Sequence, residues 1–116
     1  MMIRQGEVYL VDFGKKYNSE LGKIRPAVVM QNNFLNKILP KAKHKSVLMI
    51  PLTSDDIVTE YKIRINKRDK LHKDSFIIAN WLCTLDPEHI LVEKGLLTTL
   101  TEAEFNNLKA RVCDLM

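Results

Sequence analysis

The strand-like segments of this chain follow one another without a helix of crossover length between them, and this feature limits the fold most. Parallel neighbours in a sheet need a connection of about a dozen residues or more, usually a helix. Here polar loops join the segments, and residues 32–40 are long enough for only one or two helical turns. The pattern therefore predicts a mostly antiparallel sheet.

Five segments are typical of strands, because they are short, apolar or alternating, and bounded by polar residues. They are residues 7–13, 25–31, 46–53, 61–65 and 75–85. In 7–13 apolar side chains fall on both faces, so we expect both faces to be covered. In 61–65 the apolar residues point inward, and Lys62 and Arg64 point outward. The 75–85 segment is expected to be one largely buried strand.

Two positions carry helix-start signals. Thr101 and Glu104 have the spacing of a capping box, and Phe105, Leu108, Val112 and Leu115 follow at helical spacing. Asp86 before Pro87 predicts a second start. The order of elements predicts one domain over residues 1–116. We expect a mainly β fold with α: a small, strongly twisted barrel with a C-terminal helix.

Charge is unevenly distributed along the chain. Residues 1–73 hold fifteen Lys and Arg against seven Asp and Glu, a balance of +8, whereas residues 74–116 hold three against seven, a balance of −4. Such asymmetry favours a basic surface for a polyanion, although a solvated lysine-rich surface is the alternative. The basic stretches 41–45 and 67–73 both fall in expected loops, where they could flank a binding cleft.

The sequence has neither a membrane-length apolar run nor a signal peptide. We therefore expect a cytoplasmic protein that needs no membrane. In that compartment Cys83 and Cys113 should be free thiols. His44, His72 and His89 are scattered without metal-ligand spacing and are expected on the surface.

Arg25 is the first candidate for a functional residue. It stands at the start of an apolar strand and directly before Pro26, which restricts its backbone to the extended region. A guanidinium fixed in this way can clamp a phosphate through paired donors. A structural ion pair with Glu20 is the alternative.

The end of the 46–53 segment carries the second candidate. Apolar residues stop at Thr53 and Ser54, whose hydroxyls could donate to phosphate oxygens, although such residues also cap turns. Asp55 and Asp56 follow, but adjacent carboxylates usually point apart, so no metal site is predicted.

Four motifs, taken together, resemble the MazF/PemK family of toxin–antitoxin ribonucleases. They are RQGEVYLVDF near the start, NSELGKIRPAVVMQNN, IPLTSDD, and CTLD at the place of the family's R-T-I-D. The resemblance covers nearly the whole chain. It implies a small SH3-like barrel, as also found in CcdB-like toxins, with a C-terminal helix.

The resemblance also implies a function: the toxin of a type II toxin–antitoxin system, a sequence-specific endoribonuclease. It would cut single-stranded mRNA without metal or cofactor, leave 2′,3′-cyclic phosphate and 5′-hydroxyl ends, and so inhibit translation. Family members are homodimers. An acidic antitoxin would be the second partner, and DNA would be contacted only through it.

The residues that match the family's motifs carry its roles over to this chain. Arg25 and Thr53 match the catalytic pair. The residues expected to bind RNA are Ser19, Lys23, Ser54 and Asn80. Glu20 is the alternative general base, because a normal arginine stays protonated.

Two positions depart from the family's pattern. Cys83 replaces the motif arginine, and Asn80 stands where an acidic residue is common, so the cut sequence stays open. A non-catalytic relative, either a gyrase-poison-like toxin or a silent RNA-binding barrel, is the alternative function.

Overall fold

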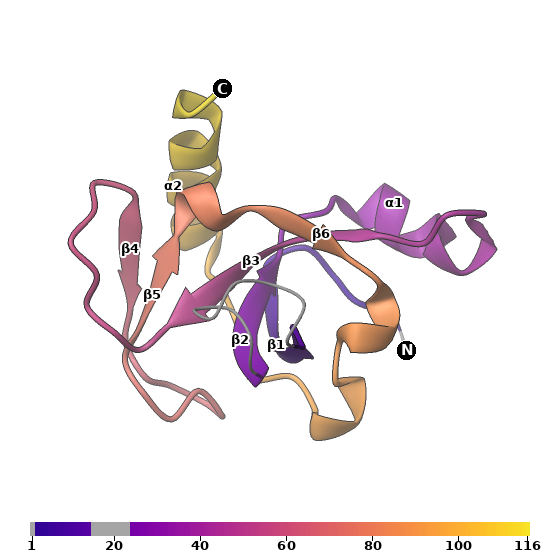
Figure 1. The fold of residues 1–116 in the computed structure, drawn as a ribbon, viewed down its shortest axis with the longest axis horizontal. Coiled ribbons are helices and arrows are strands. Elements are labelled where there is room, and N and C mark those ends of the chain that lie inside the picture. The colour runs from indigo at the N-terminus through magenta and orange to yellow at the C-terminus, as the bar shows by residue number, and fades with distance from the viewer. Residues whose placement is uncertain (1, 15–23) are drawn as a thin grey trace.

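The structure is a computed structural model that describes residues 2–14 and 24–116. Within them, the strands are β1 Glu7–Asp12, β2 Ile24–Val29, β3 Val47–Thr53, β4 Lys62–Ile65, β5 Ser75–Ile78, β6 Cys83–Leu85 and β7 Thr98–Thr99. The helices are α1 Asn33–Ile38 and α2 Glu102–Asp114. Short 3₁₀ turns span Leu39–Lys41, Ala79–Trp81, Pro87–His89 and Val92–Lys94. Figure 1 shows the arrangement.

The described strands form a sheet in the order β4-β5-β3-β2-β1-β7, with β6 on β3. Every pairing between them is antiparallel, which confirms the sequence prediction. Strand β3 is central: one edge pairs with β2, and the other pairs first with β6 and then with β5.

The prediction of one strand over residues 75–85 is wrong. Leu52 pairs with Ile77, and Met49 pairs with Cys83. Three steps along β3 therefore match six steps along the other chain. The three extra residues, Ala79–Trp81, form a 3₁₀ turn between β5 and β6, and the turn carries the chain around the bend of the sheet.

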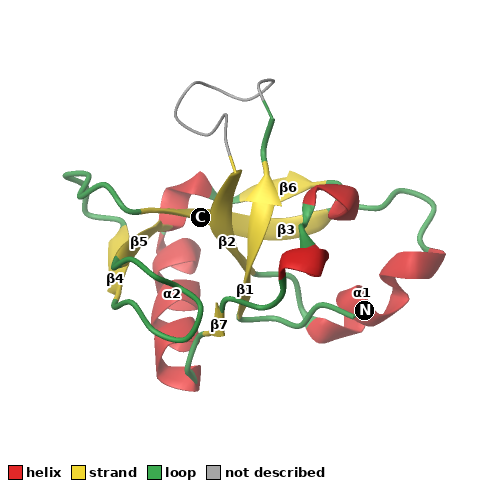
Figure 2. Cartoon of the chain, turned by 90° about the horizontal axis from the view of Figure 1, so that it is seen from below, coloured by secondary structure: helices red, strands yellow, loops and turns green. Residues whose placement is uncertain are grey.

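Two apolar clusters cover the two faces of the sheet. One contains Val8, Val28 and Leu52 together with Leu108 of α2. The other contains Val11, Val29 and Met49 and is closed by residues that include Ile3, Leu85 and Ile90. Strand β1 supplies both clusters, so the expectation that both of its faces are covered is confirmed. Figures 1 and 2 show α2 beside β4 and β5, and α1 on the far side of the sheet.

Helix α2 begins with the predicted capping box. The Glu104 amide donates to Thr101 Oγ1 at 3.1 Å, and the Thr101 amide donates to Glu104 Oε1 at 2.8 Å. Leu108 is fully buried and Phe105 and Val112 pack partly against the same cluster, but Leu115 is the C-cap residue and is 38% exposed. The apolar stripe therefore ends one turn earlier than predicted.

The predicted helix start at Asp86 leads only to the 3₁₀ turn Pro87–His89. Its cap is as expected, because Asp86 Oδ1 accepts from the Glu88 amide at 2.9 Å. The chain then bends at Ile90, which is buried and bridges to Val11 of β1. Packing of this apolar side chain thus ends the turn before it becomes a helix.

Arg68 is a structural residue rather than a loop cation. Its guanidinium donates to both carboxylate oxygens of Glu104, at 2.7 and 2.8 Å, and to Thr98 Oγ1 at 3.1 Å. Asp69 in turn accepts from Thr98 Oγ1 at 2.7 Å. These bonds tie residues 67–73 to β7 and to the start of α2, so Arg68 holds the fold together, whereas the sequence analysis counted it among the loop cations that could flank a binding cleft.

We expect Glu104→Gln to lower the free energy of unfolding at pH 7 by about 1.5–3 kcal/mol, the range for hydrogen bonds to charged groups. The bonds from Arg68 hold the pKa of Glu104 below its ordinary value. A lowered carboxyl pKa stabilises the fold above the unfolded-state pKa, and the effect is lost as pH falls through the folded one.

Chemical denaturation between pH 7 and pH 3 measures both effects. The wild-type protein should lose stability below about pH 5 more steeply than the Glu104→Gln variant. The matched control is Glu102→Gln, an exposed carboxylate in the same first turn, which should change little. Equal acid profiles for all three proteins would contradict the assignment.

Candidate active site

Arg25 and Thr53 lie at adjoining ends of the neighbouring strands β2 and β3. The β2–β3 ladder ends with the pair Ala27 and Pro51. Arg25 lies two residues before Ala27 and Thr53 two residues after Pro51, so both lie just beyond the same end of the ladder. The fold therefore brings together the two residues that the sequence analysis selected separately.

The face of the sheet that carries Arg25 is apolar at one end and polar at the other. Val11, which pairs with Arg25 on β1, is fully buried in the second apolar cluster. Arg25 itself is half-buried. The guanidinium stem thus starts at the edge of a packed core, and the pairing with Val11 on β1 fixes the direction in which the side chain leaves the strand.

Thr53 is 4% exposed, and its Oγ1 accepts from the Asp55 amide at 3.1 Å. The turn-capping alternative is therefore correct, but it does not exclude a second role, because the hydroxyl keeps its proton for another acceptor. Asp56, which follows in the sequence, pairs with Lys62 of β4.

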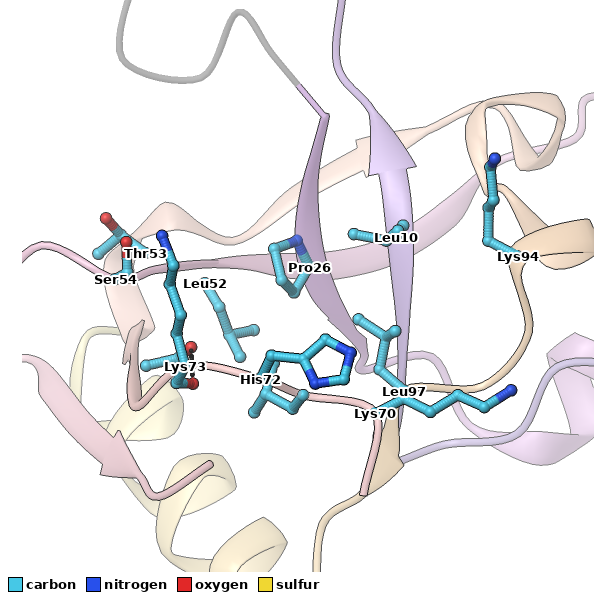
Figure 3. Close-up of a pocket in the computed structure, with 12 residues that line it drawn as sticks. Leu10, Pro26, Leu52, Thr53, Ser54, Lys70, His72, Lys73, Lys94 and Leu97 are labelled. Atoms are coloured by element: carbon cyan, nitrogen blue, oxygen red, sulfur yellow. Dashed lines mark hydrogen bonds between the residues drawn. The ribbon is translucent and has the colours of Figure 1, made fainter. Parts of the chain in front are cut away.

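A hollow of about 670 Å³ lies on the other face, under Leu10, Pro26 and Leu52. Thr53 and Ser54 border it at the end of β3. In Figure 3 the ring of His72 lies among the apolar residues, and Lys73 extends toward the strand end with Thr53 and Ser54. The sequence analysis treated His72 only as a surface residue, since nothing in its flanking residues indicates a cavity.

Of the remaining residues that the sequence analysis discussed, the structure describes Asn80 and Cys83. Asn80 is exposed on the 3₁₀ turn after β5. Cys83 pairs with Met49 on the opposite edge of β3 from Arg25, and burial raises the pKa of its thiol. Cys83 therefore supplies no charge in place of the family's arginine. Ser19, Glu20 and Lys23 lie outside the described residues.

The two basic stretches also differ in position. Lys70 and Lys73 both line the hollow, Lys73 on the side of Thr53 and Lys70 beside Leu97 (Figure 3). Residues 41–45 precede β3, and Thr53 ends it. A strand rises about 3.3 Å per residue, so the first stretch stands roughly 20 Å from the candidate site, and only the second flanks it.

Within residues 2–14 and 24–116, no three His, Cys, Asp or Glu side chains gather as a metal ion would require. Among the same residues no helix combines the length and apolarity that a membrane crossing needs. Arg25 and Thr53 can both donate hydrogen bonds to the oxygens of an anion.

Comparison with known proteins gives a consistent result at the levels of sequence and fold. Residues 4–116 match the family described as PemK-like, MazF-like toxin of type II toxin–antitoxin system. A curated relative, the endoribonuclease MazF of Staphylococcus epidermidis, is 36% identical over 108 residues, which cover 89% of this chain and 82% of the relative.

Solved structures share the fold at lower identity. MazF from Deinococcus radiodurans superposes with a TM-score of 0.75 at 15% identity, over 99% of this chain and 96% of that one. An endoribonuclease in complex with its cognate antitoxin, from a mycobacterial species, gives 0.70 at 20% identity, over 97% and 92%. The predicted MazF/PemK-like barrel with a C-terminal helix is thereby confirmed.

Proposed function

Because the chain belongs to the PemK-like, MazF-like toxin family of type II toxin–antitoxin systems, we propose that it is a toxin that cuts single-stranded RNA. The curated relative carries the name of an endoribonuclease. The observation that supports this function most directly is that Arg25 and Thr53 lie just beyond one end of the β2–β3 ladder.

In the proposed reaction the ribose 2′-oxygen attacks the neighbouring phosphorus as its proton passes to a base. The bond from phosphorus to the 5′-oxygen breaks, and that oxygen takes up a proton. The products are a 2′,3′-cyclic phosphate and a 5′-hydroxyl. Negative charge grows on the equatorial oxygens, where the Arg25 guanidinium and the Thr53 hydroxyl would donate hydrogen bonds. Glu20 is our candidate for the base, since Arg25 stays protonated.

Ser19, Lys23, Ser54 and Asn80 are the proposed RNA contacts around this pair. Ser54 supports the assignment by its place beside Thr53 at the mouth of the hollow. Sequence choice would follow from such contacts, because proteins read single-stranded RNA through unstacked bases.

We further propose a cytoplasmic homodimer that binds an acidic antitoxin, with DNA contacted only through that partner. The net charge of +8 over residues 1–73 supports an anionic partner. The solved complex of a mycobacterial endoribonuclease with its cognate antitoxin supports an antitoxin as that partner.

Purified protein should cut single-stranded RNA in the presence of excess EDTA and leave duplex RNA largely intact. The reason is that the proposed reaction uses only side-chain donors and a base. Gel analysis with end mapping would give the cut sequence and the chemistry of the ends. Strict dependence on added magnesium would refute the proposal, and a folded protein that binds RNA without cutting it would favour a silent barrel.

Arg25→Ala should reduce the cleavage rate by on the order of 10²–10³, the usual cost of losing one donor to the transition state. Arg25→Lys should also be slow, because a point charge cannot replace the planar fork. Thr53→Val should be slow and Thr53→Ser much less so, since serine keeps the hydroxyl. Unfolding midpoints control for stability. Normal cleavage by folded Arg25→Ala protein would exclude the assignment.

Replacing Lys70 and Lys73 together by Gln should weaken RNA binding and flatten its salt dependence. Each phosphate contact on a single strand contributes about −0.7 to the slope of log affinity against log salt, so the change should approach about 1.4. The matched control replaces Lys43 and Lys45 at the other end of β3 and should leave the slope unchanged. Both pairs are measured in Arg25→Ala protein. A reversed result would place the RNA along residues 41–45.

A further inference from the structure

Thr53 begins a row of facing residues that continues onto β5 and β4. Thr53 pairs with Phe76 on β5, and Phe76 pairs with Arg64 on β4. These three side chains lie on one face, since directly opposite residues share a face. Strands are spaced by about 4.8 Å, so Phe76 stands roughly 5 Å and Arg64 roughly 10 Å from Thr53. Figure 1 shows these three strands in sequence across the sheet.

Phe76 departs from the pattern of its own strand. Ile77 and Ile78, which follow it, are 0% and 1% exposed, whereas Phe76 is only half-buried. Its partner across the ladder, Arg64, is exposed, because Ile63 and Ile65 take the inward positions of β4. An aromatic ring therefore stands at the surface in line with Thr53 of the proposed catalytic pair.

Two cations accompany this ring. Lys62 Nζ lies 5.2 Å from the ring centroid and pairs with Asp56. Arg64 Nη2 pairs with Asp74 at 3.0 Å, and its side chain is 62% exposed. Exposed ion pairs of this kind contribute little to stability. Both cations can therefore exchange a surface carboxylate for a phosphate at small cost.

We propose that Phe76 is a stacking platform for the base of a nucleotide next to the cut, and that Lys62 and Arg64 bind the adjoining phosphates. This inference rests on the proposed function. Aromatic side chains that alternate with cations are how proteins hold single strands, because every base has a stacking face. The row also gives the RNA a direction across the sheet, from β3 through β5 to β4.

An acidic peptide is the other ligand that an aromatic ring with two cations could take. The RNA is favoured because Phe76 pairs directly with Thr53, next to the end of β2 that carries Arg25. A nucleotide bound there is joined by its own backbone to the phosphate between the catalytic pair. The test below makes the peptide one of its outcomes.

The experiment uses an RNA oligonucleotide with the mapped cut sequence and a 2′-deoxy nucleotide at the cut position, which removes the attacking hydroxyl. Fluorescence anisotropy gives its Kd for wild-type protein and variants. Phe76→Ala should weaken binding roughly 5- to 150-fold, the range for loss of one base–aromatic stack. Phe76→Trp should bind like wild type, and Phe76→Leu, which keeps apolar packing without a ring, should bind as poorly as Phe76→Ala.

The matched control is Phe34→Ala, because Phe34 is 71% exposed on α1 at the far side of the sheet. It should bind RNA like wild type. Abasic substitution at each position of the oligonucleotide then locates the base. At one position next to the cut, loss of the base should cost wild type the same factor as Phe76→Ala and cost that variant nothing further.

Three results would overturn the inference. Phe76→Ala or Phe76→Leu protein that binds the oligonucleotide as tightly as wild type shows that the ring only packs. Full affinity for RNA combined with loss of binding to an acidic antitoxin peptide assigns the surface to that partner. Weak binding without coupling to any abasic position excludes stacking. Each leaves RNA cleavage by wild-type protein intact, whereas failure of the proposed function would appear as absence of cleavage.

Discussion

The register between β2 and β3 is the constraint on which the rest of the structure depends. The pairs Ala27 with Pro51 and Val28 with Ile50 place alternate residues of both strands in the two apolar clusters. A slip by one residue would turn every side chain of a strand to the opposite face. Burial on both faces therefore fixes the register, and the register brings together the strand ends that carry Arg25 and Thr53.

This origin has a consequence for the proposed chemistry. A guanidinium is useful for charge stabilisation only if it is positioned before the reaction, and long side chains lose entropy when they are positioned. Here the core supplies that order, because Arg25 starts beside buried Val11 and Thr53 is itself buried. The contacts that stabilise the sheet therefore also set the geometry of the site.

At the end of β3 the two faces of the sheet carry different kinds of side chain. One face carries the row from Thr53 to Arg64, and the other carries the apolar hollow with His72 and Lys73. Thr53 belongs to the row and also borders the hollow, because β3 ends there and the chain turns at Asp55. A single-stranded RNA that crosses the end of β3 would therefore meet hydrogen-bond donors on both faces of the sheet.

The sequence by itself determined the class of fold and the identity of the proposed catalytic pair. Alternation in 61–65, the capping box at Thr101 and the absence of crossover helices are local signals, and local sterics and hydrogen bonding decide such features. The proline after Arg25 and the abrupt end of the apolar run at Thr53 are local as well. Motif order then linked them to a family, which the comparisons confirmed.

Only the tertiary structure decided which residues share a surface. The break between β5 and β6 depends on three extra residues in the pairing with β3, and no local signal at Ala79–Trp81 reports a partner strand. In the sequence Arg68 is one cation among many, and only the fold brings Glu104 within hydrogen-bond distance of it. The two isoleucines beside Phe76 predict a core position for it, whereas the strand register places Phe76 opposite Thr53. Long-range pairing sets these positions, and a sequence carries that pairing only as a sum of many weak contacts.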